Sequence, residues 1–550
     1  MIKKGITLLV VSCLTIAHSF GQSWRWGRQG ITKQSVEGVA VSVDNNGNSF
    51  LTGDVSDTLK FDTITLTSKT ADVFVVKYDS VGNVLWAKQS INNSGVSYSV
   101  SMASDDSGNV YVCGIIGNSI TFDTTTLTGR GTFLVKYDMN GNVRWAKRLT
   151  TSALYVSVSI DGKGYPYLLA YRFLNRYDPS GNLLWADSLP VGPIYYQIAA
   201  TRGKKHSNSV YVTGHFNGPS TLVYGKDTLV CASNTSSIFV IKCDSSGKIQ
   251  WARQSKTNGF KAAYLPGNGW CAVASDIDGN AFITGYYDST ITFGSYTLPS
   301  EYNLYITNMY VGSYDSAGNV RWANAITSKD SCRLGGFSVS VDTDGHVYFC
   351  GACGPVDTNH ISIMYNSDTL RLTHMYDASV FIQCDKNGNL QCGCLVPSGG
   401  DDNNCVASDY TGRYVYFGGD LAYPCIFGAD TLSKNSFVEV PFVARWQTCF
   451  NTENSTLQLS KKEPAINLFP NPSTGQFTLS LSNVSEKSAS GRTSCNMEVY
   501  NVLGERVESE KVKGESEEID LSGQPNGIYL YRVITENGGL VGSGKFVIQK

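Results

Sequence analysis

Aspartate-rich segments are the first features of this sequence that could carry out chemistry. Residues 276–279 (DIDG) and 342–345 (DTDG) resemble the start of calcium-binding loops. Neither segment has a glutamate at the twelfth loop position, which normally supplies a bidentate ligand. The same kind of segment recurs along the chain where a turn is expected. We therefore predict structural turns at these positions and no metal site.

The cysteines could bind zinc or form disulfides. Cys350 and Cys353 are separated by two residues, and Cys392 and Cys394 by one, which is close to the spacing of zinc ligands. Of the 15 cysteines only Cys13 precedes residue 22, so 14 remain in the rest of the chain. In a chain expected to leave the reducing cytosol, disulfides are the usual state of so many cysteines. We predict disulfides rather than metal, with the pairing undetermined.

Other motifs give little support to an enzyme or a nucleotide site. Residues 539–545 (GLVGSGK) have the spacing of a phosphate-binding loop, but Phe546 stands where Ser or Thr is required, so a strand turn is predicted. Five histidines follow residue 21, without an HExxH motif or a recognisable triad order. We predict no catalytic, cofactor-binding or metal-binding residues. Charged residues make up 16% with a formal net charge of -2, so nothing indicates a nucleic-acid partner.

Residues 1–21 are predicted to be a signal peptide. Two lysines precede an apolar run over residues 6–17, and small residues lead to a predicted cleavage between Gly21 and Gln22. The run is shorter than the roughly 20 residues that a membrane span needs, and no later segment is long enough. Lipid attachment at Cys13 is the disfavoured alternative, because apolar sequence continues past it. We expect an exported chain without a transmembrane segment.

One phrase recurs six times and predicts a β-hairpin. Each copy has an alternating apolar run, an Asp-x-x-Gly turn and a second alternating run, as in FVVKYDSVGNVLWAK. The aspartate can accept hydrogen bonds from its own turn, while the glycine supplies the positive φ. The copies begin at Phe74, Phe133, Phe173, Phe239, Val311 and Phe381.

A second recurring phrase precedes each of these hairpins and predicts a second β-hairpin in each repeat unit. It has seven copies, as in VSVDNNGNSFLTG, which end at Gly53, Gly114, Ala170, Gly214, Gly285, Gly351 and Gly418. Two hairpins form a four-stranded antiparallel sheet of about 60 residues, which is too small to bury its own faces. Such sheets stack radially into a propeller. The predicted fold class is all-β, with a seven-bladed β-propeller over residues 22–450.

The two ends of this region predict how the ring closes. The seventh unit has a third strand at residues 442–446 but no fourth, whereas Trp26-Gly27-Arg28-Gln29 near the N-terminus matches the fourth strand at residues 86–89. Pairing the two ends would remove free strand edges. The recurring tryptophans are predicted to pack between blades, with Cys392 at the sixth unit's position. They are Trp26, Trp86, Trp145, Trp185, Trp251 and Trp322.

These phrases resemble those of bacterial β-propeller repeat proteins and, more distantly, of quinoprotein-type propellers. Quinoprotein cofactor sites use adjacent cysteines, and this chain has no Cys-Cys pair, so no cofactor is expected. Insertions between the second and third strands vary in length and are nearly absent in unit three, which predicts a binding rim with a notch. FDTITL-like phrases in these insertions predict one extra strand per blade. Their Asp-Thr-apolar triplets also resemble O-glycosylation sequons of Bacteroidota.

A polar linker at residues 451–463 precedes a second module at residues 464–550. About seven alternating segments separated by Gly, Pro and Asn predict a small Ig-like β-sandwich. The module resembles the type A C-terminal sorting domain of type IX secretion. The residues that carry the resemblance are Pro470, Asn471, Pro472, Gly475, Tyr500, Asn501, Gly504, Gly527, Tyr529 and Lys545. It implies passage through the periplasm to the outer-membrane surface or medium, with the type IX machinery as partner.

Three functions are compatible with this organisation. We favour a non-catalytic surface or secreted binding or adhesion module, whose extracellular ligand is a glycan or a protein. The alternative is an extracellular enzyme that degrades polysaccharide or peptide and uses the propeller rim, with paired acids that the sequence alone does not place. A structural surface component is the third possibility.

Overall fold

The computed structural model is built entirely from β-strands over its described residues. These are residues 24–34, 36–150, 153, 155–202, 209–257, 271–300, 306–328, 332–355, 361–365, 368–372, 378–397, 405–421, 425–432, 439–447, 465–469, 471, 473–482, 495–502, 505–512, 516–535 and 540–550. The predicted signal peptide with its Gly21–Gln22 cleavage site and the predicted linker lie outside them. The chain divides into two compact units, Met1–Asn451 and Thr452–Lys550. The all-β prediction is confirmed.

Seven antiparallel sheets with a common four-strand order make up the first unit. Three sheets consist of β3 (Gly38–Val43), β4 (Ser49–Val55), β7 (Asp72–Tyr78) and β8 (Val84–Gln89); of β10 (Tyr98–Ser104), β11 (Val110–Ile116), β14 (Gly131–Tyr137) and β15 (Val143–Leu149); and of β16 (Val156–Ile160), β17 (Pro166–Ala170), β18 (Phe173–Tyr177) and β19 (Leu183–Ser188). The next two consist of β20 (Ile194–Ala200), β21 (Ser209–Asn217), β24 (Ser236–Asp244) and β25 (Ile249–Gln254); and of β27 (Cys271–Ser275), β28 (Ala281–Tyr287), β31 (Asn308–Tyr314) and β32 (Val320–Ser328). The last two consist of β33 (Cys332–Val341), β34 (Val347–Pro355), β37 (Ala378–Cys384) and β38 (Leu390–Pro397); and of β39 (Cys405–Ser408), β40 (Val415–Leu421), β43 (Val440–Trp446) and β1 (Trp24–Gln29).

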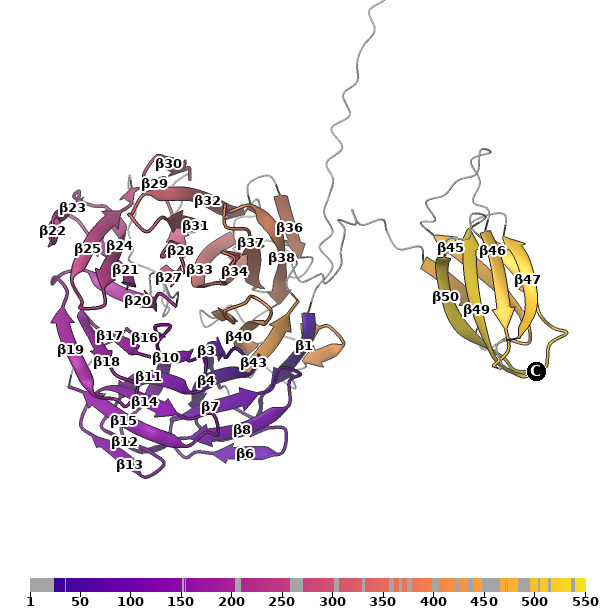
Figure 1. Ribbon diagram of the computed structural model, residues 1–550, viewed down its shortest axis with the longest axis horizontal. Helices are drawn as coiled ribbons and strands as arrows, with labels where there is room; N and C mark the ends of the chain where they lie inside the picture. The colour runs from indigo at the N-terminus through magenta and orange to yellow at the C-terminus, as the bar shows by residue number, and fades with distance from the viewer. Residues whose placement is uncertain are drawn as a thin grey trace, which may run out of the picture. The chain divides into compact units, whose positions relative to one another are not determined.

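The first strand of each sheet, here called the inner strand, faces the middle of a propeller-like ring (Figure 1). Each inner strand contacts the inner strand of the next sheet, in the cyclic order β3, β10, β16, β20, β27, β33, β39 and back to β3. The last sheet combines both ends of the unit, because β1 pairs antiparallel with β43 and Gly27 lies opposite Ala444. The ring of inner strands therefore positions the site described below.

The Asp-x-x-Gly turns form with the hydrogen bonds that their sequence predicts. In the turn after β7, Asp79 Oδ1 accepts from the backbone N–H groups of Val81 and Asn83, while Asp79 Oδ2 accepts from Asn83 Nδ2. Gly82 closes this turn with a φ of 91°. Both carboxylate oxygens of the aspartate thus accept hydrogen bonds within the turn and stabilise the hairpin.

Each of the six recurring tryptophans links its sheet to the next one. Trp251 on β25, for example, donates its indole N–H to Ser316 O in the β31–β32 turn, at 3.1 Å. Its ring also covers Gly318 of that turn, where a Cβ atom would come within 2.9 Å of the indole. The equivalent donor–acceptor pairs are Trp26 to Ser80, Trp86 to Met139, Trp145 to Pro179, Trp185 to Ser245 and Trp322 to Lys386.

The sheet that ends in β1 has no third-to-fourth-strand turn, because its fourth strand comes from the other end of the chain. The preceding sheet, which packs against it, has Cys392 at the tryptophan position. Here Trp446 donates its indole N–H to Gln383 Oε1 at 3.2 Å and packs against Trp24, with ring centroids 4.8 Å apart. Aromatic packing therefore takes the place of the tryptophan-to-turn contact at this boundary.

The insertions form two-stranded hairpins, so the predicted single extra strand is wrong. In the first of them, Asp62 adopts a φ of 51° between the two strands and turns the chain back on itself. The hairpins in the described residues are β5 (Thr58–Phe61) and β6 (Ile64–Thr67), β12 (Ser119–Phe122) and β13 (Thr125–Thr128), β22 (Ser220–Tyr224) and β23 (Asp227–Cys231), β29 (Ile291–Phe293) and β30 (Tyr296–Leu298), β35 (Ile361–Tyr365) and β36 (Asp368–Leu372), and β41 (Cys425–Phe427) and β42 (Asp430–Leu432). Three are extended by the short strands β2 (Ile31–Thr32), β9 (Ile91–Ser94) and β26 (Lys256–Thr257), and β35 also pairs with β32.

The sheet of β16 to β19 carries no such hairpin, because Tyr171 and Arg172 alone join β17 to β18. In other sheets the hairpin covers the first residue of the fourth strand, as where the glycine turn at Gly294 packs against Val320. Leu183 takes that position in β19 and is 54% exposed. The outer strand of this sheet is therefore left uncovered.

Twelve described cysteines are thiols rather than disulfides: Cys113, Cys231, Cys243, Cys271, Cys332, Cys350, Cys353, Cys384, Cys394, Cys405, Cys425 and Cys495. All except Cys405 are buried in the strands. Burial raises the pKa of the Cys384 thiol to about 12, which keeps it protonated. The predicted disulfides are not found among these twelve residues, whereas Cys392 is disulfide-bonded.

The second unit consists of two facing sheets around one core. One contains β44 (Ala465–Phe469), β45 (Gln476–Ser482) and β48 (Ser516–Asp520), and the other β47 (Arg506–Val512), β46 (Cys495–Tyr500), β49 (Gly527–Thr535) and β50 (Leu540–Ile548). Phe477 and Leu479 from the first sheet share a buried cluster with Met497, Val499 and Phe546 from the second.

The contact between tryptophan and turn glycine predicts unequal effects of two Gly→Ala substitutions. Gly318 and Gly164 both have positive φ, 87° and 81°, so alanine strains both backbones by roughly 1–2 kcal/mol. A Cβ atom at Gly164 meets nothing within 4 Å, whereas at Gly318 it meets Trp251. We expect Gly318→Ala to lower the free energy of unfolding by about 1 kcal/mol more than Gly164→Ala in urea titrations. Equal losses would show that the tryptophan contact contributes nothing.

Candidate functional site

A cavity of about 190 Å³ lies inside the ring of inner strands, at the end where the Asp-x-x-Gly turns leave them. All seven inner strands contribute to its wall. Its apolar part is a ring of equivalent residues, one from each strand: Val41, Met102, Val158, Ile198, Val273, Val339 and Val406. Most of the remaining wall residues are Ser, Ala, Thr or Tyr, and three charged residues, Arg202, Asp276 and Asp342, also line the cavity.

Serine hydroxyls in the wall mostly tie neighbouring inner strands together. Ser104 donates to Val43 O at 2.8 Å, Ser159 accepts from Ala200 N at 2.9 Å, and Ser340 shares a hydrogen bond with Ser408. The hydroxyls of Ser42 and Ser275 differ, because both are buried atoms without a hydrogen-bond partner in the described part of the chain. Both are thus buried hydroxyls with unused hydrogen-bonding capacity in residues that line the cavity.

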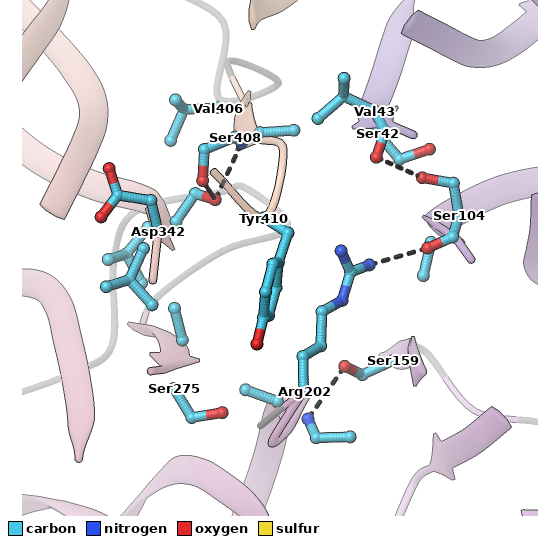
Figure 2. A pocket seen from close by; sticks show the side chains of 18 of the residues that line it. Ser42, Val43, Ser104, Ser159, Arg202, Ser275, Asp342, Val406, Ser408 and Tyr410 are labelled. Carbon is cyan, nitrogen blue, oxygen red and sulfur yellow. Dashed lines mark hydrogen bonds between the residues drawn. The ribbon is translucent and has the colours of Figure 1, made fainter. Parts of the chain in front are cut away.

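Arg202 is the only cation among the residues that line the cavity. It follows β20, at the one first-to-second-strand turn that lacks the aspartate found in the other six. Its Nη2 donates to Ser104 O at 2.7 Å, across the intervening sheet, and this contact holds the guanidinium at the cavity (Figure 2). The same side chain also borders a second cavity of about 340 Å³, formed by the turns around Asp105 and Asp161.

Tyr410 reaches the cavity from the turn between β39 and β40. Figure 2 shows its phenol ring beside the Arg202 side chain, with both pointing into the cavity. Its main chain is held in place because Tyr410 O accepts from Thr343 N of the neighbouring sheet at 3.0 Å. A planar cation and a phenolic hydroxyl therefore both line the cavity.

The two wall carboxylates, Asp276 and Asp342, are engaged by their own turns. Asp276 accepts from Asp278 N and from the backbone and side chain of Asn280. Asp342 accepts from Tyr348 Oη at 3.0 Å and pairs with His346 Nδ1 at 2.9 Å. These saturated oxygens agree with the predicted structural turns, and the described residues contain no cluster of ligands that could hold a metal ion.

Other buried polar groups lie at the far ends of the second strands, on the insertion side. Asp54 accepts from Ser99 N at 2.9 Å in the neighbouring sheet, and burial raises its pKa to about 8, with a further rise from Glu37. His215 shares a 2.9 Å hydrogen bond with Tyr196 Oη, and burial lowers the pKa of this histidine to about 4. At neutral pH both groups are therefore mainly uncharged.

Three of the predicted sorting residues, Asn471, Gly527 and Tyr529, contact the last strand, which itself contains Lys545. Gly475, Tyr500 and Asn501 contact other parts of the module. Asn471 Oδ1 accepts from Val547 N at 2.9 Å and Asn471 Nδ2 lies 3.5 Å from Lys545 O. The Tyr529 ring stacks on Phe546, and Gly475 has a φ of 107° where a Cβ atom would be 2.7 Å from Ser522 Cα. Gly527 begins β49, while Pro470, Pro472 and Gly504 lie outside the described residues. Asn471, Gly527 and Tyr529 thus fasten the C-terminal strand to its sandwich.

Sequence reasoning missed Arg202, Tyr410 and Asp54. A signal for Arg202 was present in the sequence, because its turn lacks the aspartate found in the other six turns. A missing residue in one copy of a repeat is, however, more simply explained by sequence divergence than by a functional site. The predicted tryptophans are all described, and they lie between sheets rather than at the cavity. The cavity also lies on the turn side of the ring, whereas the sequence placed the interaction face on the insertion side; that rim stays a prediction.

Comparison with known families identifies the C-terminal module. Residues 467–549 match the family model described as a secretion system C-terminal sorting domain. A WD repeat-containing protein of Acanthamoeba polyphaga mimivirus, itself uncharacterized, is 24% identical over 464 residues, covering 64% of this chain and 33% of the relative. The match therefore spans about a third of that relative's length.

Among solved structures, three illustrate the likeness. A protein of unknown function from Bacteroides caccae is 12% identical and covers 55% of this chain and 91% of its own, with a TM-score of 0.28. The Pan2 WD40 domain of Neurospora crassa is 8% identical and covers 65% and 90%, with a TM-score of 0.28. PorZ of Porphyromonas gingivalis, a surface component of the type IX secretion system, is 9% identical and covers 95% and 100%, with a TM-score of 0.16. Scores this low carry no inference about function.

The module therefore is a type IX secretion sorting domain, as predicted from its motifs. Such a domain implies interaction with the secretion machinery and a destination outside the cell or on its surface. None of the described segments is a helix that is long and apolar enough to cross a membrane.

The raised pKa of Asp54 predicts a pH-dependent stability. Between about pH 4 and pH 8 the folded protein keeps a proton on Asp54 that the unfolded chain releases, so the free energy of unfolding falls as pH rises through this window. Asp54→Asn should flatten this slope in urea titrations from about pH 5 to about pH 8.

Asp79→Asn is the matched control for this experiment. Burial acts to raise the pKa of Asp79, but hydrogen bonds from Asn83 and Val81 outweigh it and hold the pKa below its usual value. This group is ionised in both states across the tested range, so its substitution should leave the slope unchanged. A steep slope that persists in Asp54→Asn would contradict the assignment.

Proposed function

We propose that the chain is a non-catalytic binding protein, exported by type IX secretion, whose propeller takes an extracellular ligand into the turn side of its central channel. The observation that carries the proposal is the cavity lined by all seven inner strands, on a chain that also carries a secretion sorting domain. A rigid ring with an open polar cavity at its centre is a typical site for a ligand.

The proposal includes a seven-bladed propeller over residues 22–450, closed by the Trp26 strand. It is supported by seven sheets of common order, by the cyclic contacts of their inner strands and by the pairing of β1 with β43. It also treats residues 464–550 as an Ig-like sandwich that serves as the export address. The two facing sheets around one core support this reading.

The binding reading is preferred to the enzyme alternative because of what lines the cavity. Its two carboxylates are used up in their turns, so neither is free to act as a general acid or base. Arg202 and Tyr410 line the cavity and can donate hydrogen bonds to a ligand, and Ser42 and Ser275 have unused hydroxyls in its wall.

Binding without turnover is the first expected outcome. The purified full-length chain should bind members of an array of glycans and extracellular-matrix proteins, and the captured ligands should be recovered unchanged by mass spectrometry. Released products from any bound ligand would favour the polysaccharide- or peptide-degrading alternative. An array without any ligand would contradict the binding function.

Export provides an independent test of the C-terminal address. In a bacterium with type IX secretion, Asn471→Ala should lower the fraction of the chain at the surface or in the medium, because it removes the side-chain contacts with Val547 and Lys545. Glu510→Ala, at an exposed position of β47, is the matched control and should be exported normally. Deletion of residues 464–550 should leave the chain in the periplasm, as measured by cell fractionation. Normal display of the truncated chain would contradict the proposal.

A further inference from the structure

The cavity contains an uncompensated positive charge. Arg202 makes no ion pair with an acidic side chain of the described residues, and its Nη2 donates to a neutral backbone carbonyl, Ser104 O. Charged groups inside proteins are normally paired, because an unpaired charge loses its hydration without compensation. A guanidinium held at a cavity wall is therefore prepared for an anion from outside.

Nearby acids do not supply that anion. Asp161, on the turn of the intervening sheet, pairs with Arg176 at 3.2 Å, and Asp44 lies 3.9 Å from Lys77. Within the cavity, Asp342 pairs with His346, and Asp276 accepts hydrogen bonds from Asp278 and Asn280 of its own turn. Asp105, which borders the second cavity with Arg202, accepts from its own turn at Ser107 and Asn109. The partly buried Arg202 guanidinium can therefore pair with an anionic ligand.

The groups around Arg202 also specify what must be attached to the anion. The hydroxyls of Ser42 and Ser275 are buried without partners, and Ser42 is only 6% exposed. Together with the Tyr410 hydroxyl, they match a ligand with several hydroxyl groups of its own. The ring of apolar inner-strand residues provides contact for the C–H faces of such a ligand.

From this arrangement we infer that the cavity binds an acidic saccharide unit, with its carboxylate or sulfate on Arg202 and its hydroxyls on Ser42, Ser275 and Tyr410. The inference rests on the proposed function and deepens it by naming the ligand class of the same site. A carboxylate is planar and a sulfate is tetrahedral, but each presents two oxygens that can accept hydrogen bonds from two N–H groups of one guanidinium.

The test titrates the full-length protein with three sugars of similar size, followed by ligand-observed NMR. These probes are glucuronic acid, glucose 6-sulfate and neutral glucose. At least one acid should bind at least about tenfold more tightly than glucose, because a charge-assisted hydrogen bond is stronger than a neutral one. Arg202→Gln should abolish this preference. Arg144→Gln, on the exposed outer strand β15 with the same loss of charge, should keep it.

Two outcomes would overturn the inference: equal binding of acidic and neutral sugars, or an unchanged preference in Arg202→Gln. If Arg202→Gln shows no thermal unfolding transition, and so is not folded, Tyr410→Phe and Ser42→Ala are tested instead. The inference would also be overturned if both of these variants bound the acidic sugar as tightly as the unmodified protein does. Absence of acid binding, while the array yields a neutral glycan or a protein ligand, refutes the inference and leaves the proposed function standing. An array without ligands contradicts both.

Discussion

The ring depends on one repeated contact, in which a tryptophan on the fourth strand of a sheet donates to the turn carbonyl of the next sheet. The same carbonyl often accepts from a second donor: Met139 O receives both the Trp86 indole N–H and the Lys77 ammonium, at 3.0 and 3.1 Å. Adjacent sheets are therefore held in register by directional bonds in addition to apolar packing. Because the inner strands are set by this register, the width of the central cavity follows from contacts at the opposite edge of each sheet.

The departures from this contact are as informative as its repetition. Cys392 replaces tryptophan at the boundary where the next sheet lacks the accepting turn, and the Trp24, Trp446 and Phe381 rings fill the space instead. Arg202 stands in the turn that lacks the usual aspartate. The first departure accompanies the joining of the chain ends, and the second places a cation at the cavity. A repeat protein can change function in this way without changing its scaffold.

Much of the fold could be predicted because the same turn and strand patterns recur in every repeat of the sequence. The Asp-x-x-Gly turns were predictable from the residues themselves, since aspartate bonds to its own turn and glycine permits positive φ. The insertion hairpins were misread as single strands, because the turn at Asp62 needs a positive φ at a residue other than glycine, which sequence patterns rarely indicate. The disulfide prediction followed from compartment and composition, and neither says which thiols approach each other.

The site was harder to predict than the scaffold because its residues are far apart in the sequence and share no motif. Arg202 and Tyr410 come from turns of different sheets, and Ser42 and Ser275 from inner strands that are not neighbours. Only closure of the ring brings them together. The C-terminal module is the opposite case, since several of its motif residues fasten one strand within a single small domain, so the pattern is continuous enough to be recognised.

The pairing of β1 with β43 also sets the order in which the protein acquires its structure. Trp24 and Trp446 lie opposite one another in the same sheet, although nearly the whole first unit separates them in the chain. Six sheets can form from consecutive residues, but the last one needs residues 24–29 and residues 440–446 together. Ring closure is thus a late, long-range event, with a large loop entropy to overcome. Until β43 pairs with β1 the unit is an open arc of sheets, and it becomes a closed ring only when its two ends meet.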